Sequence, residues 1–318
     1  MSAGTAPSVL GLDIGGTKLA AGVVDADGRV HSFLVVPTQG EQGPRAVLDR
    51  LFALGRKALA EAGAEPGGDV AAVGIGCGGP LDLDRGTLLA PPHLPGWRDV
   101  PVVAEAGAAF GLPAALDNDG AAAAAAEHCY GAGVGTRDMV YLTLSTGVGG
   151  GIVVDGEVRR GAGGNGAELG HVIVDRRGRP CRGCGGRGCL EAYVSGTSIA
   201  ERAADELGTP GLTAADVAAA AAAGEPVAVR VWQETVAALA SGLTSIVNVL
   251  EPELIVLGGG VTRSGEALIG PARAAVRAAA MTPAGRAVRV ERAGLGDRVG
   301  VVGAAAVAQQ RLVDGVPT

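Results

Sequence analysis

Alternating apolar and polar positions dominate the first part of the chain and predict three short strands. The apolar runs cover residues 9–14, 19–25 and 30–36. Gly15-Gly16 separates the first two runs and Asp27-Gly28 separates the next two, and both dipeptides are typical of tight hairpin turns. The pattern therefore predicts a three-stranded antiparallel meander.

Helical spacing takes over after the meander. Pro44 stands near a first turn, and apolar residues recur three or four positions apart up to Gly63. The same criteria predict strands over residues 70–75 and 114–116 and helices over residues 101–110 and 121–130, each helix ended by a glycine. This alternation of strands and helices predicts an α/β fold.

The pattern begins again at residue 138. A strand over residues 138–146 enters a glycine-rich loop at residues 147–151, much as the first strand enters Gly15-Gly16. A helix, a strand and a helix follow at residues 231–249, 254–257 and 273–280. Two similar halves predict a duplicated architecture of two domains, which a length of 318 residues allows. The alternative is that unrelated segments use glycine turns independently.

Charge and composition narrow the possible partners. The formal net charge is −7, and the two lysines, Lys18 and Lys57, form no basic patch, so nucleic acid is not an expected partner. The chain has no N-terminal signal pattern and no unbroken apolar run that approaches about 18 residues. We therefore expect a cytoplasmic protein with no membrane partner.

Three of the five cysteines lie in one glycine-rich stretch that follows a histidine. The spacing His-x9-Cys-x2-Cys-x4-Cys supplies imidazole and thiolate groups, the ligands that zinc prefers, from His171, Cys181, Cys184 and Cys189. Thiols in a chain without a secretion signal favour a metal site over disulfides. Four protein ligands leave no open position for water, so the pattern predicts a structural zinc ion.

Three loops follow strands and are rich in glycine, which lets backbone N–H groups approach phosphate oxygens. They are Asp13-Ile-Gly-Gly-Thr-Lys18, Ser145-Thr-Gly-Val-Gly-Gly-Gly151 and Leu257-Gly-Gly-Gly260. One Gly-Gly pair is more often an ordinary hairpin turn, but three such loops favour phosphate binding, and Asp13 can hold Mg²⁺ through water. The sequence has neither a Walker motif nor a dinucleotide-binding fingerprint.

Polar residues end the strand predicted at residues 114–116. Asp117, Asn118 and Asp119 lead into the next helix, where one of them is expected to cap free N–H groups. A cap needs only one of the three, so the others remain available for chemistry. A carboxylate at the C-terminal end of a strand is where a general base is expected.

Taken together, these motifs resemble those of the ROK (repressor, open reading frame, kinase) family of sugar kinases, in the family's order and over nearly the whole chain. The matching segments are Asp13-Ile-Gly-Gly-Thr-Lys18, Gly74-Ile-Gly-Cys-Gly-Gly-Pro-Leu-Asp82, Leu94-Pro-Gly-Trp97, Asn118-Asp119, Ser145-Thr-Gly-Val-Gly-Gly150, Glu168-Leu-Gly-His171, Cys184-Gly-Gly-Arg-Gly-Cys-Leu-Glu191 and Leu257-Gly-Gly-Gly260. The resemblance implies a duplicated, actin-like or hexokinase-like (ribonuclease H-like) pair of α/β domains with a cleft between them. The expected domains are residues 1–117, joined by a C-terminal helix at about residues 299–318, and residues 118–298.

The resemblance also implies an ATP-dependent kinase for the 6-hydroxyl of a hexose, above all a glucokinase, with Mg²⁺ and structural Zn²⁺. Asp119 is the implied catalytic base. The implied sugar contacts are Gly79, Asn118, Asp119, Glu168, His171 and Glu191. The implied contacts to ATP and its magnesium are Asp13, Gly15, Gly16, Thr17, Lys18, Thr146, Gly147, Gly258 and Gly259. The expected partners are a hexose and ATP, and the expected assembly is a homodimer or homotetramer.

Departures from the family's pattern leave alternatives open. His93 stands where many of its glucokinases have Asn, Gly78 where they often have Pro, and one extra residue separates Cys181 from Cys184. The first two lie near the expected sugar pocket, so a kinase of N-acetylmannosamine, N-acetylglucosamine or fructose is an alternative. The family's sugar-responsive repressors carry an N-terminal helix-turn-helix, whereas here the first predicted strand begins at Val9. A sugar sensor without a DNA-binding domain is a further alternative.

Some residues have simpler interpretations. Trp97 either borders the sugar or anchors the core, and Trp232 is expected in a helix core. Glu201, Arg202 and Asp205 are expected on a solvated helix face.

Overall fold

The structure is a computed structural model that describes residues 7–314 in two compact units. The first unit takes in the described residues up to Val134, the segment Val158–Ala167 and the described residues from Asp297 onward, and the second consists of Gly135–Glu157 and Glu168–Gly296. The predicted boundary after Asp117 differs from this division, because helix α3 (Asp119–Tyr130) packs with helix α10 (Val299–Asp314) in the first unit. A Cβ at Gly303 would lie 2.6 Å from the Ala122 carbonyl, so a glycine allows this close packing.

A five-stranded sheet in the order β3-β2-β1-β4-β7 forms the centre of the first unit. Its strands are β1 (Ser8–Ile14), β2 (Lys18–Val24), β3 (Leu34–Pro37), β4 (Val70–Cys77) and β7 (Ala114–Asn118). β2 is antiparallel to β1 and β3, whereas β1, β4 and β7 are parallel, so the predicted meander is confirmed. Its third strand begins at Leu34 and not at residue 30: Val30 forms only an isolated bridge with Val24, and the Val23 N–H then donates to Ser32 Oγ at 3.1 Å, which interrupts the ladder before Leu34.

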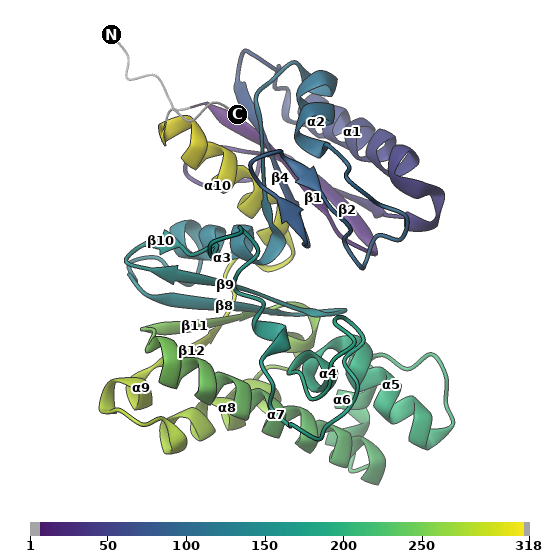
Figure 1. Cartoon of the computed structure of the whole chain (residues 1–318), viewed down its shortest axis with the longest axis vertical. Helices are drawn as coiled ribbons and strands as arrows, with labels where there is room; N and C mark the ends of the chain where they lie inside the picture. The colour runs from purple at the N-terminus through teal and green to yellow at the C-terminus, as the bar shows by residue number, and fades with distance from the viewer. Residues whose placement is uncertain (1–6, 315–318) are drawn as a thin grey trace. The chain divides into compact units, whose positions relative to one another are not determined.

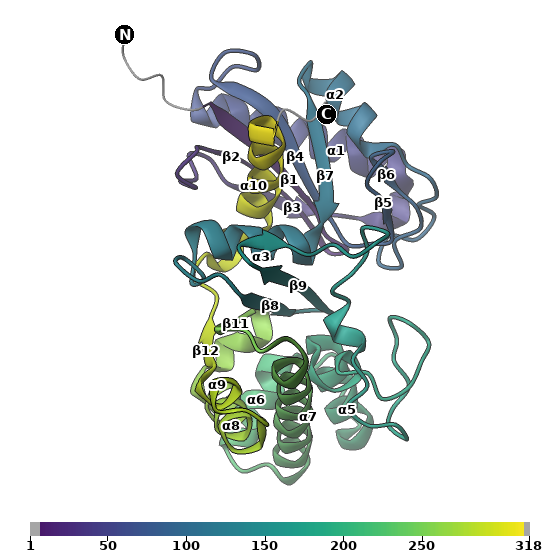
Figure 2. The same ribbon diagram turned by 60° about the vertical axis from the view of Figure 1, so that its left-hand side comes forward.

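Helices cover both faces of this sheet (Figures 1 and 2). Besides α3 and α10, the unit contains η1 (Gly40–Gln42), α1 (Gly43–Ala62), β5 (Leu81–Asp82), β6 (Thr87–Leu88), α2 (Val102–Phe110) and η4 (Gly296–Arg298), which starts at the unit's edge. Leu10 and Leu12 point towards α1 and α2, and the alternate positions of the strands face α10. A Cβ at Gly74 would lie 1.7 Å from the Ala304 carbonyl oxygen, so glycine lets α10 lie directly on the sheet.

Helix boundaries in this unit follow the predicted signals. Pro44 lies in the first turn of α1, and Gly63 follows its last residue in the left-handed conformation, with a φ of 64°. Gly111 follows α2 in the same conformation, with a φ of 66°. Glycine adopts this conformation without the strain of a Cβ, which makes it a reliable helix terminator.

The second unit repeats the sheet arrangement of the first, in the order β10-β9-β8-β11-β12. Its strands are β8 (Met139–Leu144), β9 (Val148–Val154), β10 (Glu157–Val158), β11 (Leu254–Gly258) and β12 (Arg289–Arg292). β8 is antiparallel to β9 and parallel to β11, which is in turn parallel to β12. In each unit, the first strand of a hairpin is followed across the sheet by two further strands that run parallel to it. The predicted duplicated α/β architecture is confirmed.

Helices of the second unit pack against one face of its sheet, where Leu142 and Ile255 join the same apolar core as Leu243 and Ile269. They are η2 (Leu169–His171), α4 (Glu191–Val194), α5 (Gly196–Leu207), α6 (Ala214–Ala222), α7 (Pro226–Leu250), η3 (Gly260–Ser264), α8 (Glu266–Ala279) and α9 (Pro283–Ala287). None of the helices in residues 7–314 combines the length and apolar character that crossing a bilayer requires.

Three predicted boundaries in the second unit are wrong. The helix predicted at residues 273–280 is α8, which begins at Glu266, directly after Gly265 at its N-cap position. Residues 149–151 do not belong to a loop, because they pair with β8 from Thr143↔Gly149 to Tyr141↔Gly151, and the turn is only Ser145–Gly147. The helix predicted at residues 231–249 begins at Pro226, because the Glu225 side chain accepts N–H bonds from the first turn. Glu225 and Pro226, which start the helix, lie before the run of apolar residues on which the prediction was based.

Candidate active site

The C-terminal end of β7 carries the three polar residues singled out in the sequence. Asn118 caps α3, since its Oδ1 accepts from the Gly120 N–H at 2.9 Å and the Ala121 N–H at 3.2 Å. Asp117 is buried, and its Oδ1 accepts from the Asn118 N–H at 2.9 Å. The expected cap therefore falls on Asn118, and Asp119 is left as the first residue of the helix, where the helix dipole favours a negative charge.

Two carboxylates of the first unit share one electrostatic environment. The pKa of Asp13, in β1, is raised to about 7, mainly by burial and further by the charge of Asp119, while the charge of Lys18 opposes the rise. Burial also raises the pKa of Asp119, while the charge of His93 lowers it. Because the charge of Asp119 raises the pKa of Asp13, joint ionisation of the two carboxylates is disfavoured. Their oxygens are the hard ligands that Mg²⁺ binds, so the pair fits a divalent cation as its counter-charge.

Hydrogen bonds at Gly15 hold the turn between β1 and β2, and the next three residues are exposed. The Gly15 N–H donates to the Lys18 carbonyl at 3.0 Å, and Thr38 Oγ1 donates to the Gly15 carbonyl at 2.6 Å. A Cβ at Gly15 would lie 2.8 Å from the Lys18 carbonyl oxygen, so a side chain has no room there. Gly16, Thr17 and Lys18 are exposed, which leaves this turn open to a phosphate.

Asn165, which the sequence did not single out, lies close to two predicted sugar contacts. Its Oδ1 accepts from the Leu81 N–H at 2.7 Å, and its Nδ2 donates to the Leu81 carbonyl at 2.8 Å. A Cβ at Gly79 would lie 3.1 Å from Asn165 Oδ1 and 3.7 Å from Asn118 Nδ2. The structure thus brings Gly79 and Asn118 together, as predicted. One Asn in a glycine-rich stretch carries no motif signal, so sequence reasoning missed Asn165.

Arg160 holds the residue before Asn118. Its Nε donates to Asp117 Oδ2 at 2.7 Å, and the Asp117 side chain is only 1% exposed. Burial raises the pKa of Asp117, and the charge of Arg160 opposes that rise. Because the other Asp117 oxygen accepts from the Asn118 N–H, the ion pair fixes the backbone that leads to Asp119.

We expect Arg160→Ala to lower the free energy of unfolding by about 3 kcal/mol at neutral pH, because a buried carboxylate loses its charged partner. Without Arg160 the pKa of Asp117 rises further, so the folded state retains a proton that the unfolded chain releases, and stability falls as pH rises above the ordinary Asp range. The loss should therefore be smaller at mildly acidic pH, as measured by urea unfolding. Arg159→Ala, at the exposed neighbouring arginine, is the control. A loss independent of pH would contradict this account.

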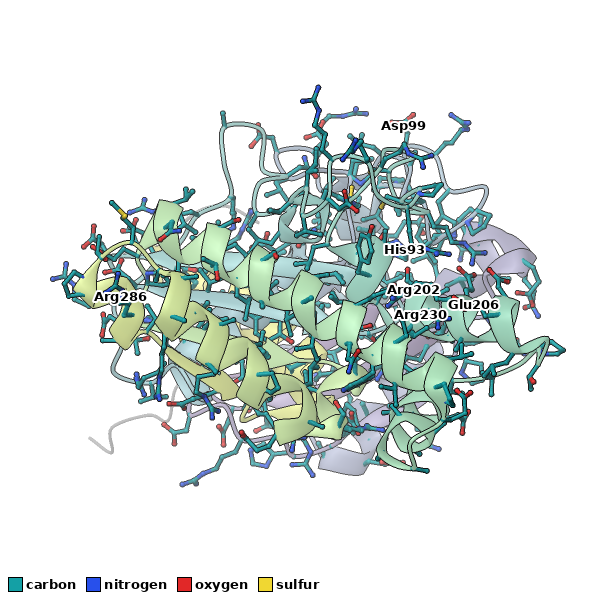
Figure 3. All side chains as sticks on the ribbon, turned by 90° about the horizontal axis from the view of Figure 1, so that it is seen from below. His93, Asp99, Arg202, Glu206, Arg230 and Arg286 are labelled. Carbon is teal, nitrogen blue, oxygen red and sulfur yellow. The ribbon has the colours of Figure 1, made fainter. Side chains whose placement is uncertain are left out.

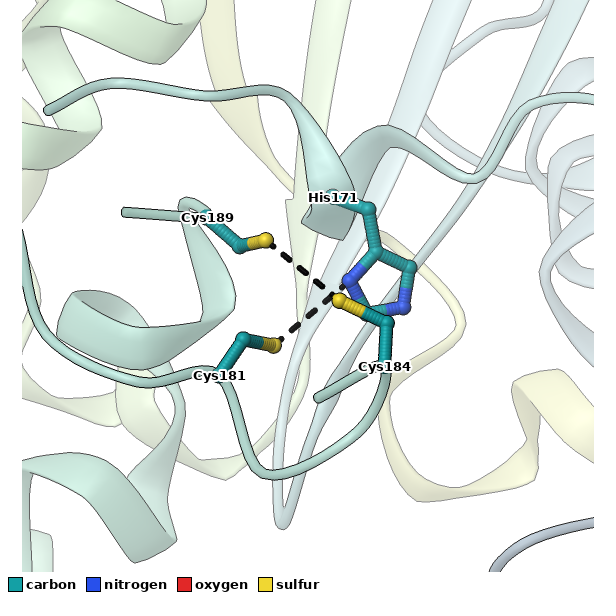
Figure 4. Close-up of side chains that lie close together, drawn as sticks. All are labelled: His171, Cys181, Cys184 and Cys189. Atoms are coloured by element: carbon teal, nitrogen blue, oxygen red, sulfur yellow. Dashed lines mark hydrogen bonds between the residues drawn. The ribbon is translucent and has the colours of Figure 1, made fainter. Parts of the chain in front are cut away.

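His171, Cys181, Cys184 and Cys189 come together in the second unit (Figure 4). Their ligand atoms all lie within 4.8 Å of one another. Cys181 Sγ is 3.7 Å from His171 Nδ1, and Cys184 Sγ is 3.6 Å from Cys189 Sγ. Tetrahedral zinc with Zn–S distances of about 2.3 Å has ligand–ligand edges of about 3.5 to 3.8 Å. The four donors fit zinc, and the extra residue before Cys184 does not displace Cys181.

Backbone bonds fold the segment that carries these ligands. The Cys181 N–H donates to the Gly186 carbonyl at 2.8 Å, and the Val174 N–H donates to the Gly188 carbonyl at 2.8 Å. A Cβ at Gly188, whose φ is +74°, would lie 1.6 Å from the Asp175 carbonyl oxygen. The glycines therefore let the two arms of the loop approach each other closely enough to share one metal ion.

The two ring nitrogens of His171 face different neighbours. Nδ1 faces Cys181, whereas Nε2 lies 4.0 Å from Glu168 Oε2. A metal bound at Nδ1 would fix the ring and with it the position of Nε2. Glu168 and His171, both predicted sugar contacts, therefore lie side by side, with one nitrogen of His171 turned away from the sulfur atoms.

Glu191, the third predicted sugar contact of this unit, connects the cysteine loop with a glycine turn. Its Oε1 lies 3.6 Å from Cys181 Sγ, and its Oε2 accepts from the Val148 N–H at 2.9 Å. A Cβ at Gly147 would lie 2.9 Å from that same oxygen. The structure thus places Glu191 beside the turn Ser145–Gly147, which carries the predicted phosphate contacts Thr146 and Gly147.

Arg202 joins the residues that follow the cysteine loop to helix α7. The prediction that it lies on a solvated helix face is wrong. Its side chain is 2% exposed and donates to the Tyr193 carbonyl at 2.5 Å, to Thr235 at 2.6 Å and to Glu234 at 2.9 Å. The Tyr193 hydroxyl donates to Asp175 at 3.2 Å, so the arginine ties the cysteine loop to α7. Figure 3 labels Arg202 and also Glu206 and Arg230, an ion pair whose side chains are about half exposed.

A cavity of about 740 Å³ opens beside the turn Ser145–Gly147. It is lined by Ser145, Thr146, Gly196, Thr197, Ala200, Glu201, Leu212, Thr213, Ala214, Ala215, Ala218, Trp232, Gly260, Val261, Arg263 and Ser264. This size accommodates a ligand as large as a nucleotide. Trp232 is buried, as expected, and also forms part of the cavity wall. Sequence reasoning missed the lining from α5 and α6, whose alanines carry no functional signal.

The third glycine loop reaches this cavity through Gly260, not through Gly258 or Gly259. A Cβ at Gly258 would lie 2.4 Å from the Tyr141 hydroxyl, and a Cβ at Gly259 would lie 2.3 Å from the Leu144 carbonyl oxygen. These two glycines permit close packing behind the cavity, and their contact with adenosine stays a prediction.

The predicted site residues fall into two groups, one in each unit. Those of the first unit are Asp13, Gly15, Gly16, Thr17, Lys18, Gly79, Asn118 and Asp119, and those of the second are Thr146, Gly147, Glu168, His171, Glu191, Gly258, Gly259 and the three cysteines. Trp97 lies in neither group: it is 2% exposed and anchors the core of the first unit.

Known proteins resemble the chain over almost its full length. It is 36% identical over 318 residues to a glucokinase of Streptomyces coelicolor, covering 95% of this chain and 97% of the relative. It is 39% identical over 256 residues to an N-acetylmannosamine kinase of Citrobacter koseri, covering 80% of this chain and 83% of the relative.

Solved structures match the fold equally well. A ROK hexokinase from Thermus thermophilus aligns with a TM-score of 0.82 and 39% identity, covering 97% of this chain and 100% of that one. A ROK family glucokinase from Streptomyces griseus, solved in complex with glucose and AMPPNP, aligns with a TM-score of 0.81 and 37% identity, covering 95% of this chain and 99% of that one. The actin-like or hexokinase-like two-domain fold is thereby confirmed. The family model of the ROK family matches residues 9–311, and the chain belongs to this family.

Proposed function

We propose that the protein is an ATP-dependent kinase that phosphorylates the 6-hydroxyl of a hexose, with glucose as the favoured sugar. The observation that carries this proposal is Asp119, a carboxylate at the start of α3 whose charge acts on Asp13, next to an exposed glycine turn. Membership in the ROK family, with glucokinases among the relatives, supports the class of reaction.

Phosphoryl transfer requires positioning and charge neutralisation more than covalent catalysis. As the 6-hydroxyl oxygen attacks the γ-phosphorus of ATP, the bond from phosphorus to the leaving oxygen of ADP breaks, and Asp119 accepts the hydroxyl proton. Asp119 must be ionised to do this, and the N-terminus of α3 favours its charge. We assign the exposed N–H groups of Gly16 and Thr17 to phosphate oxygens.

Mg²⁺ accompanies ATP in this proposal. It would supply positive charge to the phosphate oxygens, and Asp13 would hold it through water. The raised pKa of Asp13 supports this role, because a carboxylate that shares its surroundings with Asp119 gains most from a nearby cation.

Glu168, His171 and Glu191 are assigned to the sugar hydroxyls of the substrate, together with Asn118. A hydroxyl both donates and accepts, and a carboxylate can accept from two hydroxyls at once. The zinc ion is structural in this proposal: by fixing His171 and Cys189 it would fix the carboxylates on either side of them.

The cavity beside Thr146 is assigned to the adenosine part of ATP. We expect Ala218→Phe to raise the KM for ATP about tenfold or more, because a phenyl ring would fill space that the nucleotide needs, while the KM for glucose changes little. Steady-state kinetics with each substrate varied in turn would measure this. Ala219→Phe, on the exposed side of the same helix, is the matched control. A larger change in the KM for glucose than in that for ATP would contradict the assignment.

A coupled kinase assay over a panel of sugars and donors tests the function as a whole. We expect the highest kcat/KM with glucose and ATP. Higher kcat/KM with N-acetylmannosamine would favour the alternative activity, for which the Citrobacter koseri relative is the supporting observation. The same assay with polyphosphate in place of ATP identifies the donor. A lack of activity with every sugar and donor would overturn the proposal in favour of a sugar sensor.

The assembly and location are proposed on the same basis. We propose a homodimer or homotetramer in the cytoplasm, and light scattering of the purified protein would measure the mass of the assembly.

A further inference from the structure

The ring of His93 fills the space in front of two glycines from different loops of the first unit. A Cβ at Gly78, which follows β4, would lie 2.5 Å from His93 Cε1 and 3.2 Å from its Nδ1. A Cβ at Gly16, in the turn between β1 and β2, would lie 3.1 Å from His93 Cβ. One half-buried imidazole therefore packs against the phosphate-type turn and against the loop that leads to Gly79.

The ring also lies within electrostatic reach of the proposed base. The titratable groups around this point are Asp119 from α3, Asp13 from β1, Lys18 from β2 and Cys77 from β4, and the one whose charge acts on His93 is Asp119. Burial lowers the pKa of His93, and the charge of Asp119 opposes this effect. The interaction is mutual, since the charge of His93 lowers the pKa of Asp119.

We propose that His93 is a positioning residue for phosphoryl transfer, whose ring holds the loops of Gly16 and Gly78 in place beside Asp119. The inference rests on the kinase activity proposed above. It has two separable parts, a steric one between the ring and position 78, and a catalytic one, the effect of this packing on kcat. The steric part makes residues 78 and 93 a coupled pair, because a Cβ at position 78 would lie 2.5 Å from His93 Cε1 and the ring would have to move.

A double-mutant cycle tests the steric part. Gly78→Ala should lower the melting temperature and kcat/KM, because its Cβ meets the His93 ring at 2.5 Å. His93→Asn removes that ring, so Gly78→Ala should cost much less in the His93→Asn background, with a coupling of about fivefold or more in kcat/KM. Additive effects in both stability and kcat/KM would overturn the steric part. His93→Gln is the second variant. It should relieve the cost of Gly78→Ala less than His93→Asn does, because Gln has a longer side chain than Asn.

The split between kcat and KM tests the catalytic part. His93→Asn should lower kcat about threefold or more at a temperature where the variant stays folded, while the KM for glucose changes less, because the ring packs against the turn assigned to phosphate. The double variant should keep this loss of kcat even where its stability has recovered, which a merely structural role would not produce. A wild-type kcat in the folded His93→Asn variant would overturn this part.

These results can be separated from a failure of the proposed function. If the wild type phosphorylates no sugar, the kinase proposal fails, whereas the coupling between residues 78 and 93 is still measurable in melting temperature. If the wild type is active but the cycle is additive and kcat is unchanged in His93→Asn, the kinase proposal stands and the role of His93 fails.

Discussion

Replacing Asp119 by Asn is expected to lower kcat by about 10² to 10⁴ while sugar binding stays nearly intact. An amide has almost the same shape as the carboxylate but cannot accept the proton that leaves the 6-hydroxyl. Asn at this position also keeps an oxygen that can accept from the Gly120 N–H, which Asp119 Oδ1 now does at 2.8 Å. The variant should therefore fold, and the loss should appear in kcat.

Sugar affinity measured by calorimetry separates chemistry from binding in this experiment. Asp84→Asn, at an exposed carboxylate of the same unit, is the matched control and should keep wild-type kcat. Near wild-type kcat in Asp119→Asn would rule Asp119 out as the base. Loss of sugar binding together with kcat would make its role positional.

Cys184→Ser is expected to release about one zinc ion per chain, because a hydroxyl is a poor substitute for a thiolate and leaves a site with three ligands. Loss of the metal frees His171 and the loop that ends at Glu191, so the KM for sugar should rise and the choice among hexoses should weaken. The KM for ATP should change much less. Elemental analysis and the sugar panel provide the two measurements.

Cys129→Ser is the matched control for the zinc experiment, since Cys129 is an exposed thiol outside the four-ligand cluster. It should keep both metal and activity. Equal weakening of sugar and ATP binding in Cys184→Ser would indicate general unfolding. A wild type that is fully active without metal, or a mapped disulfide among the three cysteines, would defeat the zinc assignment.

Features set by neighbouring residues could be predicted from the sequence. Gly63 and Gly111 end helices because the left-handed conformation is a local property of the backbone. The spacing of His171 and the three cysteines predicted a cluster, and the loop between them is short enough to bring the four side chains together. The cap of α3 was likewise predictable as a type of residue, although not as Asn118 in particular.

Features that depend on distant contacts could not be predicted in this way. Arg202 looks solvated in its own helix, and its burial depends on Thr235 and Glu234 of α7. Gly149–Gly151 have a loop composition, but register with β8 makes them a strand. The bond between Arg160 and Asp117 joins segments with no shared motif, and only the fold brings them together.

The cap at Asn118 fixes the direction of the hydrogen bonds at this end of β7. Its Oδ1 already accepts from the Gly120 and Ala121 N–H groups, so the group that Asn118 has left for a ligand is the Nδ2 amide, which donates. A substrate atom held there must be an acceptor, and a hydroxyl that accepts from Asn118 has its own proton left to give elsewhere. In a sugar kinase that proton would be directed to a carboxylate. The bonds that cap α3 would therefore set which groups donate and which accept at this end of the site before any ligand binds.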